Sequence, residues 1–327
     1  MQKKLNQIIN EIKKHENTVI MSHKNADLDA LASSVCLFQI IKSLNKDCFI
    51  YLDVDAKNPS IEKALYYLSR YNKTIYFTRT LNKKIINPET LLIIVDTQVP
   101  DLLENEEVLE ICNDVIIIDH HSTNKRYISK AKIEHIDPTK SSVVEIMINY
   151  LKELNLKPDS LISTIMLAGM EIDTNSFDTK TTAETYEAAA FLAKNKANQI
   201  LKRKIKKESR EAYLKRNELI KKSFMITKDV AICALDNKVY YRSDLAEISE
   251  DLLTLDKVEA AFTIGRTETN KISISARSLG NYDVKKIMIQ LGGGGHKNEA
   301  ATQITGSTME EVKNKLIELI KRWNKWK

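Results

Sequence analysis

Short aliphatic runs that end in polar residues dominate the first half of the chain. The clearest runs are 18–22, 91–95 and 115–118, and each is rich in Ile, Val or Leu. Continuous apolar runs of this length are typical of strands that are buried on both faces of a parallel sheet. Two further strands are predicted at 47–53 and 74–78.

Apolar residues at helical spacing follow or separate these strands. They run from Ala30 to Leu44, from about Ser60 to Arg70 and from Pro158 to Leu167. Strands that alternate with helices predict an α/β fold with a doubly wound, mostly parallel sheet. We assign this N-terminal domain to residues 1–195.

A basic segment without Gly or Pro follows, and its apolar residues keep near-helical spacing. Residues 194–228 contain 13 Lys or Arg and 3 Glu, so they carry a net charge of +10. The whole chain carries +6, which leaves 6 − 10 = −4 for the remainder. We predict one long connecting helix within 196–228. Its charges are interpreted as a solvated face, with attraction of a polyanionic substrate as the alternative.

The last hundred residues show a different pattern. Strands are predicted at 230–235, 259–264 and 271–278, and Thr269-Asn270-Lys271 is interpreted as a hairpin turn. Thr308 and Glu311 form a capping-box pattern at the start of a final helix. A smaller α+β domain is therefore expected over 229–327.

Length and composition agree with this division. A chain of 327 residues suits about two domains, and its 43% hydrophobic content supports an ordinary core. No apolar run reaches the ~18 residues of a membrane span, and no signal-peptide pattern begins the sequence, so we expect a cytoplasmic protein without a membrane partner. The four cysteines are scattered and are interpreted as reduced structural residues.

Carboxylates and histidines follow each of the aliphatic runs. In a parallel sheet the carboxyl ends of the strands share one edge, where ligands bind. A bland alternative is that each Asp caps a helix, but clustered like charges need a cation to offset their repulsion. The candidate metal ligands are His23, Asp27, Asp29, Asp96, His120 and Asp173, and Asp119 and His121 flank His120.

Six candidate ligands exceed what one catalytic ion needs, because such an ion keeps positions open for water and substrate. A pair of divalent ions bridged by one carboxylate is the simplest arrangement, and it suits an in-line displacement at phosphorus. Mixed imidazole and carboxylate ligands suit Mn²⁺ among other divalent ions, and the lack of a nearby Cys argues against structural zinc.

Two features of the C-terminal segment suit an anionic ligand. The glycines at 292–295 offer backbone N–H groups without Cβ atoms, although a tight turn would also explain them. Arg277 lies at the end of a predicted strand, where it would grip a phosphate or form an ordinary surface charge.

In order along the chain, these segments resemble the motifs of the DHH phosphoesterases with their accompanying DHHA1 domain. The resemblance implies one Mn²⁺ held by His23, Asp27 and Asp96 and a second held by Asp29, Asp96, His120 and Asp173. It implies that Asp119 orients a ligand ring and that His121 faces the scissile phosphate. The substrate contacts that it implies are Ser141, Ser142, Arg277, Gly293, Gly294, Gly295 and His296.

Within that family, 168–177 and 287–296 are most similar to the catalytic half of the membrane-bound cyclic-di-AMP phosphodiesterases. The leading hypothesis is therefore a free-standing, Mn²⁺-dependent enzyme that hydrolyses cyclic di-AMP to pApA, and possible further cleavage to AMP stays open. The alternatives are an oligoribonuclease that also dephosphorylates 3′-phosphoadenosine 5′-phosphate (pAp), and a nucleotide-binding sensor without catalysis. The expected partner is a small nucleotide, and a homodimer stays open.

Overall fold

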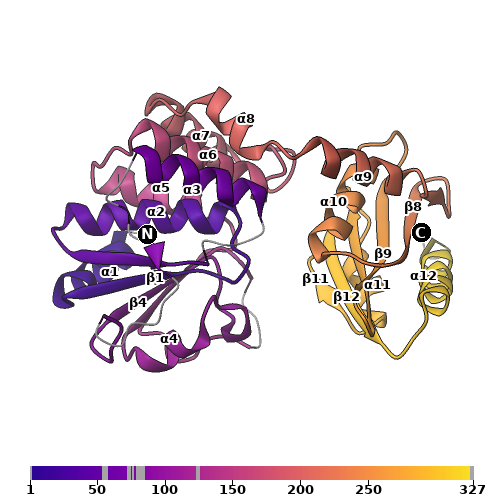
Figure 1. Cartoon of the computed structure of the whole chain (residues 1–327), viewed down its shortest axis with the longest axis horizontal. Coiled ribbons are helices and arrows are strands. Elements are labelled where there is room, and N and C mark those ends of the chain that lie inside the picture. The colour runs from indigo at the N-terminus through magenta and orange to yellow at the C-terminus, as the bar shows by residue number, and fades with distance from the viewer. Residues whose placement is uncertain are drawn as a thin grey trace. The chain divides into compact units, whose positions relative to one another are not determined.

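The computed structural model describes residues 2–53, 58–71, 75, 77–78, 85–122 and 126–324. The chain forms two compact units, Met1–Glu208 and Ser209–Lys327. Each unit has its own six-stranded sheet and its own apolar core (Figure 1).

The sheet of the first unit is parallel throughout, as the sequence predicts. Its order β3-β2-β1-β4-β5-β6 reverses direction between β1 and β4, and at such a switch point an α/β sheet opens a crevice beyond its carboxyl ends. The strands are β1 (Asn17–Met21), β2 (Asp47–Tyr51), β3 (Phe77–Thr78), β4 (Leu91–Val95), β5 (Val115–Asp119) and β6 (Ile133–Ile136). Thr74 and Tyr76 of the predicted 74–78 strand lie outside the described residues.

Side chains alternate between two cores on either side of this sheet. Leu91, Ile93 and Val95 join one core, and Leu92 and Ile94 join the other. Figure 1 shows α2, α3 and α5 over one face and α4 over the opposite face. The helices of this unit are α1 (Gln2–Lys14), α2 (Leu28–Ser43), α3 (Pro59–Tyr71), α4 (Glu106–Ile111), α5 (Val143–Glu153), α6 (Ser160–Asp173), α7 (Ala183–Lys194) and α8 (Gln199–Lys206), with a 3₁₀ turn at Pro100–Leu102.

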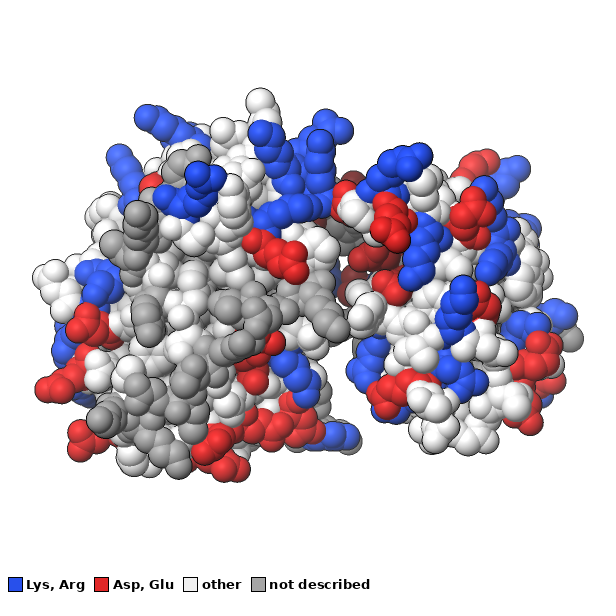
Figure 2. All heavy atoms as spheres, in the orientation of Figure 1, with Lys and Arg blue, Asp and Glu red and all other residues white. Residues whose placement is uncertain are grey.

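The prediction of one long connecting helix within 196–228 is wrong. The segment contains α8 and a separate helix α9 (Arg210–Ile220), and the boundary of the two compact units falls between these helices in the sequence. Ser209 explains the break, because its hydroxyl accepts a hydrogen bond from the amide of Ala212 (3.0 Å) and caps α9. Lys and Arg side chains crowd the part of the first unit that α8 occupies (Figure 2).

The second unit is a mixed α+β domain with sheet order β11-β12-β10-β9-β8-β7. Helix α10 packs with the alternate residues Ala231 and Cys233 of β8, whereas α11 and α12 pack on the opposite face. The strands are β7 (Phe224–Met225), β8 (Val230–Val239), β9 (Ala260–Glu268), β10 (Lys271–Ser278), β11 (Gly294–Gly295) and β12 (Glu299–Thr305), and the helices are α10 (Arg242–Leu253), α11 (Val284–Gln290) and α12 (Met309–Asn324).

The local signals in this unit match the structure. Thr269 and Asn270 connect the antiparallel strands β9 and β10. Glu311 accepts hydrogen bonds from the amide (2.7 Å) and hydroxyl (2.9 Å) of Thr308, which completes the capping box of α12. Among the described residues, no helix combines the length and apolarity that crossing a membrane requires.

Candidate functional site

The six predicted ligands gather beyond the carboxyl ends of β1, β4 and β5, with Asp96 at the centre. Asp96 Oδ2 lies 3.4 Å from His23 Nε2, and its Oδ1 lies 3.5 Å from His120 Nε2. Asp173, the last residue of α6, lies 3.0 Å from His120 Nε2. The ligand atoms fall into two groups, each within a span of 4.8 Å: His23, Asp27 and Asp96 form one, and Asp29, His120 and Asp173 form the other.

His23 and His120 each direct their Nδ1 atom toward a backbone carbonyl oxygen. His23 Nδ1 lies 3.0 Å from the carbonyl of Lys24, and His120 Nδ1 lies 3.3 Å from the carbonyl of Lys140. With Nδ1 at a carbonyl, each ring turns its Nε2 toward the carboxylates of the cluster. Second contacts of this kind are typical of metal-binding histidines.

Two carboxylates of the cluster also accept hydrogen bonds from amides at the start of a helix. Asp27 Oδ1 accepts the amides of Asp29 (2.9 Å) and Ala30 (3.0 Å), so it caps α2. Asp29 accepts the amides of Val143 (2.8 Å) and Val144 (2.9 Å) at the start of α5. The capping interpretation is therefore correct for Asp27, whereas Asp29 lies within α2 and bonds the start of a helix distant in sequence. These hydrogen bonds leave further carboxylate lone pairs free for a cation.

Gly169 lets α6 approach α2 beside these ligands. A Cβ atom at this position would lie 2.8 Å from the carbonyl oxygen of Leu28 and 3.1 Å from Asp29 Cα. The close approach brings Asp29 and Asp173 into one group because Asp173 is one turn further along α6.

The electrostatics of this cluster suit a divalent cation. Burial, together with the charge of Asp173, raises the pKa of Asp29 to about 8, and burial and the charge of Asp29 raise the pKa of Asp96 far above its usual range. Asp96 Oδ1 and His120 Nε2 are buried and make no hydrogen bond within the described part of the chain. A cation would supply the missing partner and favour the ionised carboxylates, so the donor set fits a metal centre.

Asp119 and His121 form a hydrogen-bonded pair next to the cluster. His121 Nδ1 lies 2.8 Å from Asp119 Oδ1, and half of the His121 side chain is exposed. Burial tends to raise the pKa of Asp119, but hydrogen bonds from His121 and Gln98 outweigh it and hold the pKa below its usual range. The pairing presents His121 Nε2 as the atom available to a ligand.

Gln98 is a site residue that the sequence analysis missed. Its side-chain amide donates to Asp119 Oδ2 (3.0 Å) and to the carbonyl of His121 (3.1 Å), and the residue is 2% exposed. Its polar side chain two residues after Asp96 was a visible signal, but its partners lie more than twenty residues away in sequence.

Ser141 and Ser142, the expected substrate contacts, lie at the start of α5. Both are buried, at 1% and 0% exposure. The Ser141 hydroxyl donates to Glu145 (2.7 Å), and the Ser142 hydroxyl accepts the amide of Glu145 (3.2 Å) as the cap of α5. Both hydroxyls therefore support the start of α5, and their contact with substrate stays a prediction.

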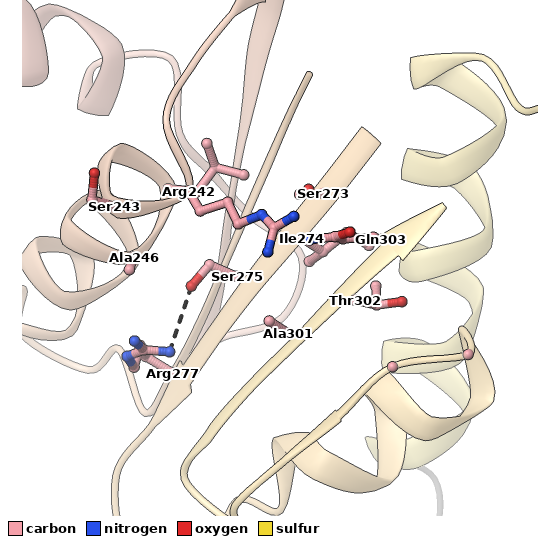
Figure 3. Close-up of a pocket in the computed structure, with 13 residues that line it drawn as sticks. Arg242, Ser243, Ala246, Ser273, Ile274, Ser275, Arg277, Ala301, Thr302 and Gln303 are labelled. Atoms are coloured by element: carbon pink, nitrogen blue, oxygen red, sulfur yellow. Dashed lines mark hydrogen bonds between the residues drawn. The ribbon is translucent and has the colours of Figure 1, made fainter. Parts of the chain in front are cut away.

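The second unit contains a pocket of about 590 Å³ on the α10 side of its sheet (Figure 3). Arg277, predicted from sequence, lies at one end, and Arg242 at the start of α10 lies over the strand near Ser273. The remaining lining residues are Ser243, Leu245, Ala246, Ile274, Ser275, Gly292, Gly293, Ala301, Thr302 and Gln303. A volume of this size suits a small-molecule ligand.

The predicted glycine loop contributes only in part. Gly293 lines the pocket, and its lack of a side chain is required because a Cβ would lie 2.2 Å from the carbonyl oxygen of Ala301. Gly294 and Gly295 instead pair with Ala301 and Ala300 of β12, and His296 is exposed outside the pocket lining. The substrate contacts expected of these three residues stay predictions.

Comparison with known proteins agrees with both units. Residues 17–170 match the model of the DHH family, N-terminal domain, and residues 228–325 match the DHHA1 domain. The chain is 32% identical over 307 residues to a protein of Bacillus subtilis named cyclic-di-AMP phosphodiesterase GdpP, covering 92% of this chain and 47% of that protein. A bifunctional oligoribonuclease and PAP phosphatase NrnA of Thermus thermophilus is 24% identical, with 92% and 88% covered.

The chain spans about half the length of the first curated relatives that it matches. Among solved structures, an exopolyphosphatase-related protein of Bacteroides fragilis superimposes with a TM-score of 0.82 at 19% identity, covering 99% of this chain and 98% of that one. RecJ of Thermus thermophilus in complex with Mn²⁺ gives a TM-score of 0.54 at 11% identity, covering 98% and 54%. At these sequence identities, the structural similarity shows a shared fold and nothing further.

Proposed function

Because the chain contains a DHH domain followed by a DHHA1 domain and belongs to the DHH phosphoesterases, we propose that it is a Mn²⁺-dependent phosphodiesterase that hydrolyses cyclic di-AMP to pApA. The relatives named as cyclic-di-AMP phosphodiesterases support this substrate, at 32% identity for the Bacillus subtilis protein and 27% for PdeA of Listeria monocytogenes. Further cleavage of pApA to AMP belongs to the same proposal.

The observation that carries the proposal is the position of Asp96 between two ligand groups. Its two carboxylate oxygens lie 3.4 and 3.5 Å from the Nε2 atoms of His23 and His120. A carboxylate in this position suits a bridging ligand. Two divalent ions, when bound, would activate water as a nucleophile and offset the charge on the phosphoryl oxygens. The proposed ligands are His23, Asp27 and Asp96 for one ion and Asp29, Asp96, His120 and Asp173 for the other.

The other residues of the proposed site would bind the phosphates or the base of the substrate. His121, held by Asp119 at 2.8 Å, would hydrogen bond a phosphate oxygen through Nε2. In the pocket of the second unit, Arg277 and the amide groups near Gly293 would bind a phosphate or base distant from the hydrolysed bond.

A second candidate function is hydrolysis of short oligoribonucleotides and of pAp. One observation favours it, because the Thermus thermophilus protein named as a bifunctional oligoribonuclease and PAP phosphatase is 24% identical to this chain over 310 residues.

The decisive experiment is product analysis after incubating the Mn²⁺-loaded chain separately with cyclic di-AMP, pApA and pAp. The leading proposal expects rapid conversion of cyclic di-AMP to pApA. Turnover confined to pApA and pAp would replace it with the second candidate. Binding without any product under Mn²⁺, Mg²⁺ or Co²⁺ would indicate a sensor.

A further inference from the structure

The last turn of α6, which carries Asp173, is tied to the neighbouring helix α8 (Figure 1). Lys202 donates to one oxygen of the Glu171 carboxylate, and Lys206 donates to the other at 2.7 Å. Burial tends to raise the pKa of Glu171, but the hydrogen bonds from the two lysines outweigh it and hold the pKa below its usual range. The Glu171 side chain is 11% exposed, so water screens these ion pairs less than it screens pairs on the surface.

The turn that follows Asp173 has a strained backbone. Asn175, Ser176 and Phe177 have φ values of 47°, 60° and 73°, in the left-handed region that costs free energy for residues other than glycine. Such a turn persists only where its surroundings hold it in place. The amide of Ser176 donates to the carbonyl of Glu171 (2.7 Å). The residue whose carboxylate meets the two lysines therefore also holds this turn.

Lys206 contacts both the carboxylate and the strained turn. Besides its ion pair with Glu171, its Nζ donates to the hydroxyl of Ser176 (3.3 Å). Helix α8 is itself anchored, because Ile205 is fully buried in the core of the first unit. The packing of α8 therefore fixes the backbone from which Lys206 reaches the end of α6.

Asp173 lies between Glu171 and the strained turn. Its carboxylate is 3.0 Å from His120 Nε2, in the ligand group that also contains Asp29. Because helix ends fray, the position of a side chain on the last residue of a helix depends on the contacts that hold its last turn. In α6 these contacts include the ion pairs of Glu171 with α8.

We propose that Glu171 is a positioning residue for the metal centre: its pairing with α8 holds the last turn of α6 and keeps Asp173 in place for a divalent ion. This inference rests on the proposed function, because it treats Asp173 as a ligand of one of the two ions. Contacts that support metal ligands contribute about 10- to 100-fold to the affinity for the metal. Loss of the pairing should therefore weaken the ion held by Asp173 by about this factor, and the ion held by His23 and Asp27 should be retained.

The test measures binding of Mn²⁺ to the full chain by electron paramagnetic resonance, in which the signal of the free ion reports how much Mn²⁺ stays unbound. Wild type should bind two ions. Glu171→Gln should bind one of them as wild type does and the other about 10- to 100-fold more weakly. Lys206→Gln should give the same loss, because it removes a contact of Glu171 and of Ser176. Adding Glu171→Gln to Asp173→Asn should cause no further loss, since Glu171 acts through Asp173.

Glu11→Gln is the matched control for the carboxylate. Glu11 is also buried and has two lysine partners, but it lies beside Asp114, directly before β5, whereas the metal ligands follow the strands. Urea unfolding in EDTA should show similar losses of stability in Glu11→Gln and Glu171→Gln, while the affinity for Mn²⁺ falls only in Glu171→Gln. Lys204→Gln is the control for the lysine, since Lys204 is exposed on α8, and it should bind both ions as wild type does.

Wild-type affinity for both ions in Glu171→Gln would overturn the inference and leave the proposed function standing. Equal losses of Mn²⁺ affinity in Glu171→Gln and Glu11→Gln would also overturn it, because the loss would then follow from stability alone. A wild-type chain that binds no Mn²⁺ would remove both the inference and the proposed function. If wild type binds two ions but hydrolyses none of cyclic di-AMP, pApA and pAp, the proposed function fails, while the Mn²⁺ affinities of the variants still decide the role of Glu171.

Discussion

At the scale of single residues, Asp96 has an unusual backbone conformation. Its φ of 62° lies in the left-handed region, which costs free energy for a residue other than glycine. The amide of Asp96 donates to the carbonyl of Ile118 (3.0 Å), which holds the turn after β4 against the neighbouring strand β5. This turn directs the carboxylate between His23 and His120.

Asp96→Asn should abolish phosphodiester hydrolysis while leaving the fold intact. An amide keeps the shape of the side chain but loses the charge and one acceptor atom, so it cannot bridge two cations. We expect turnover to fall by more than the ~100-fold that accompanies loss of a supporting contact. Initial rates with bis(p-nitrophenyl) phosphate in Mn²⁺ provide the measurement, and circular dichroism checks the fold. Substantial turnover by this variant would contradict the bridging role.

Gln98 offers a second test at this scale. Gln98→Met keeps the length of the side chain but removes both hydrogen bonds that hold Asp119 and the carbonyl of His121. We expect kcat to fall about 10- to 100-fold, with KM nearly unchanged, because the position of His121 loosens while the other proposed substrate contacts stay in place.

The control for this prediction is Gln290→Met, which makes the same replacement on the exposed end of α11. It should leave both kinetic constants unchanged. Equal losses of kcat in the two variants, or an effect on KM alone, would argue against a positioning role for Gln98.

At the scale of elements, the site depends on how closely three helices meet. Asp29 on α2 accepts two amides from the start of α5, and Gly169 on α6 lies against the backbone of α2. Glu145 strengthens the start of α5, since it is buried and forms an ion pair with Lys140 (2.9 Å), whose carbonyl lies 3.3 Å from His120 Nδ1. Movement of any of these helices would therefore separate ligands.

Gly169→Ala should destabilise the chain because its Cβ would overlap the carbonyl oxygen of Leu28 at 2.8 Å. Backbone atoms cannot move aside as a flexible side chain can, so we expect a loss of about 1–3 kcal/mol in the free energy of unfolding. Urea unfolding measures the change. Gly294→Ala is the matched control, because its Cβ would meet nothing within 4 Å and its φ is not positive. Equal stability of Gly169→Ala and wild type would refute this account of the helix contact.

At the scale of the whole molecule, a second histidine and carboxylate group provides a useful contrast. Glu11, His15 and Asp114 also lie within 4.8 Å of one another through their ligand atoms. Lys132 is paired with Glu11 (2.9 Å) and Asp114 (3.1 Å), and Lys14 is paired with Glu11 (2.7 Å). Lysines already neutralise this group, whereas burial and neighbouring carboxylates raise the pKa of Asp29 and of Asp96 in the other cluster.

Mn²⁺ should therefore stabilise the molecule through the Asp96 cluster alone. A hundredfold excess of the ion over its dissociation constant adds about 2.7 kcal/mol to the stability of the folded state. We expect thermal unfolding to move to higher temperature with Mn²⁺ and to return after EDTA. Asp96→Asn should remove most of this shift, and Asp114→Asn should keep it. If Asp114→Asn loses the shift in unfolding temperature, the ion binds at the group of Glu11, His15 and Asp114, and the prediction for the Asp96 cluster is wrong.

The sequence determined the parallel sheet and the chemistry at its edge. Runs such as 91–95 and 115–118 are apolar on both faces, and this pattern leaves few arrangements other than a covered parallel sheet. Parallel strands end on one edge, so Asp96 and His120 were expected to meet without knowledge of the loops. The ordered motifs also identified both domains before any comparison.

Only the tertiary structure decided how the supporting residues are used. Ser142 caps α5, Ser141 donates to Glu145, Gln98 donates to Asp119, and Arg242 lines the pocket of the second unit. Each role depends on how the elements pack and on the rotamer of the side chain. The local sequence pattern determines neither of these. Strand ends follow from periodicity, whereas partners of single polar side chains follow from distances that arise only when the elements pack together.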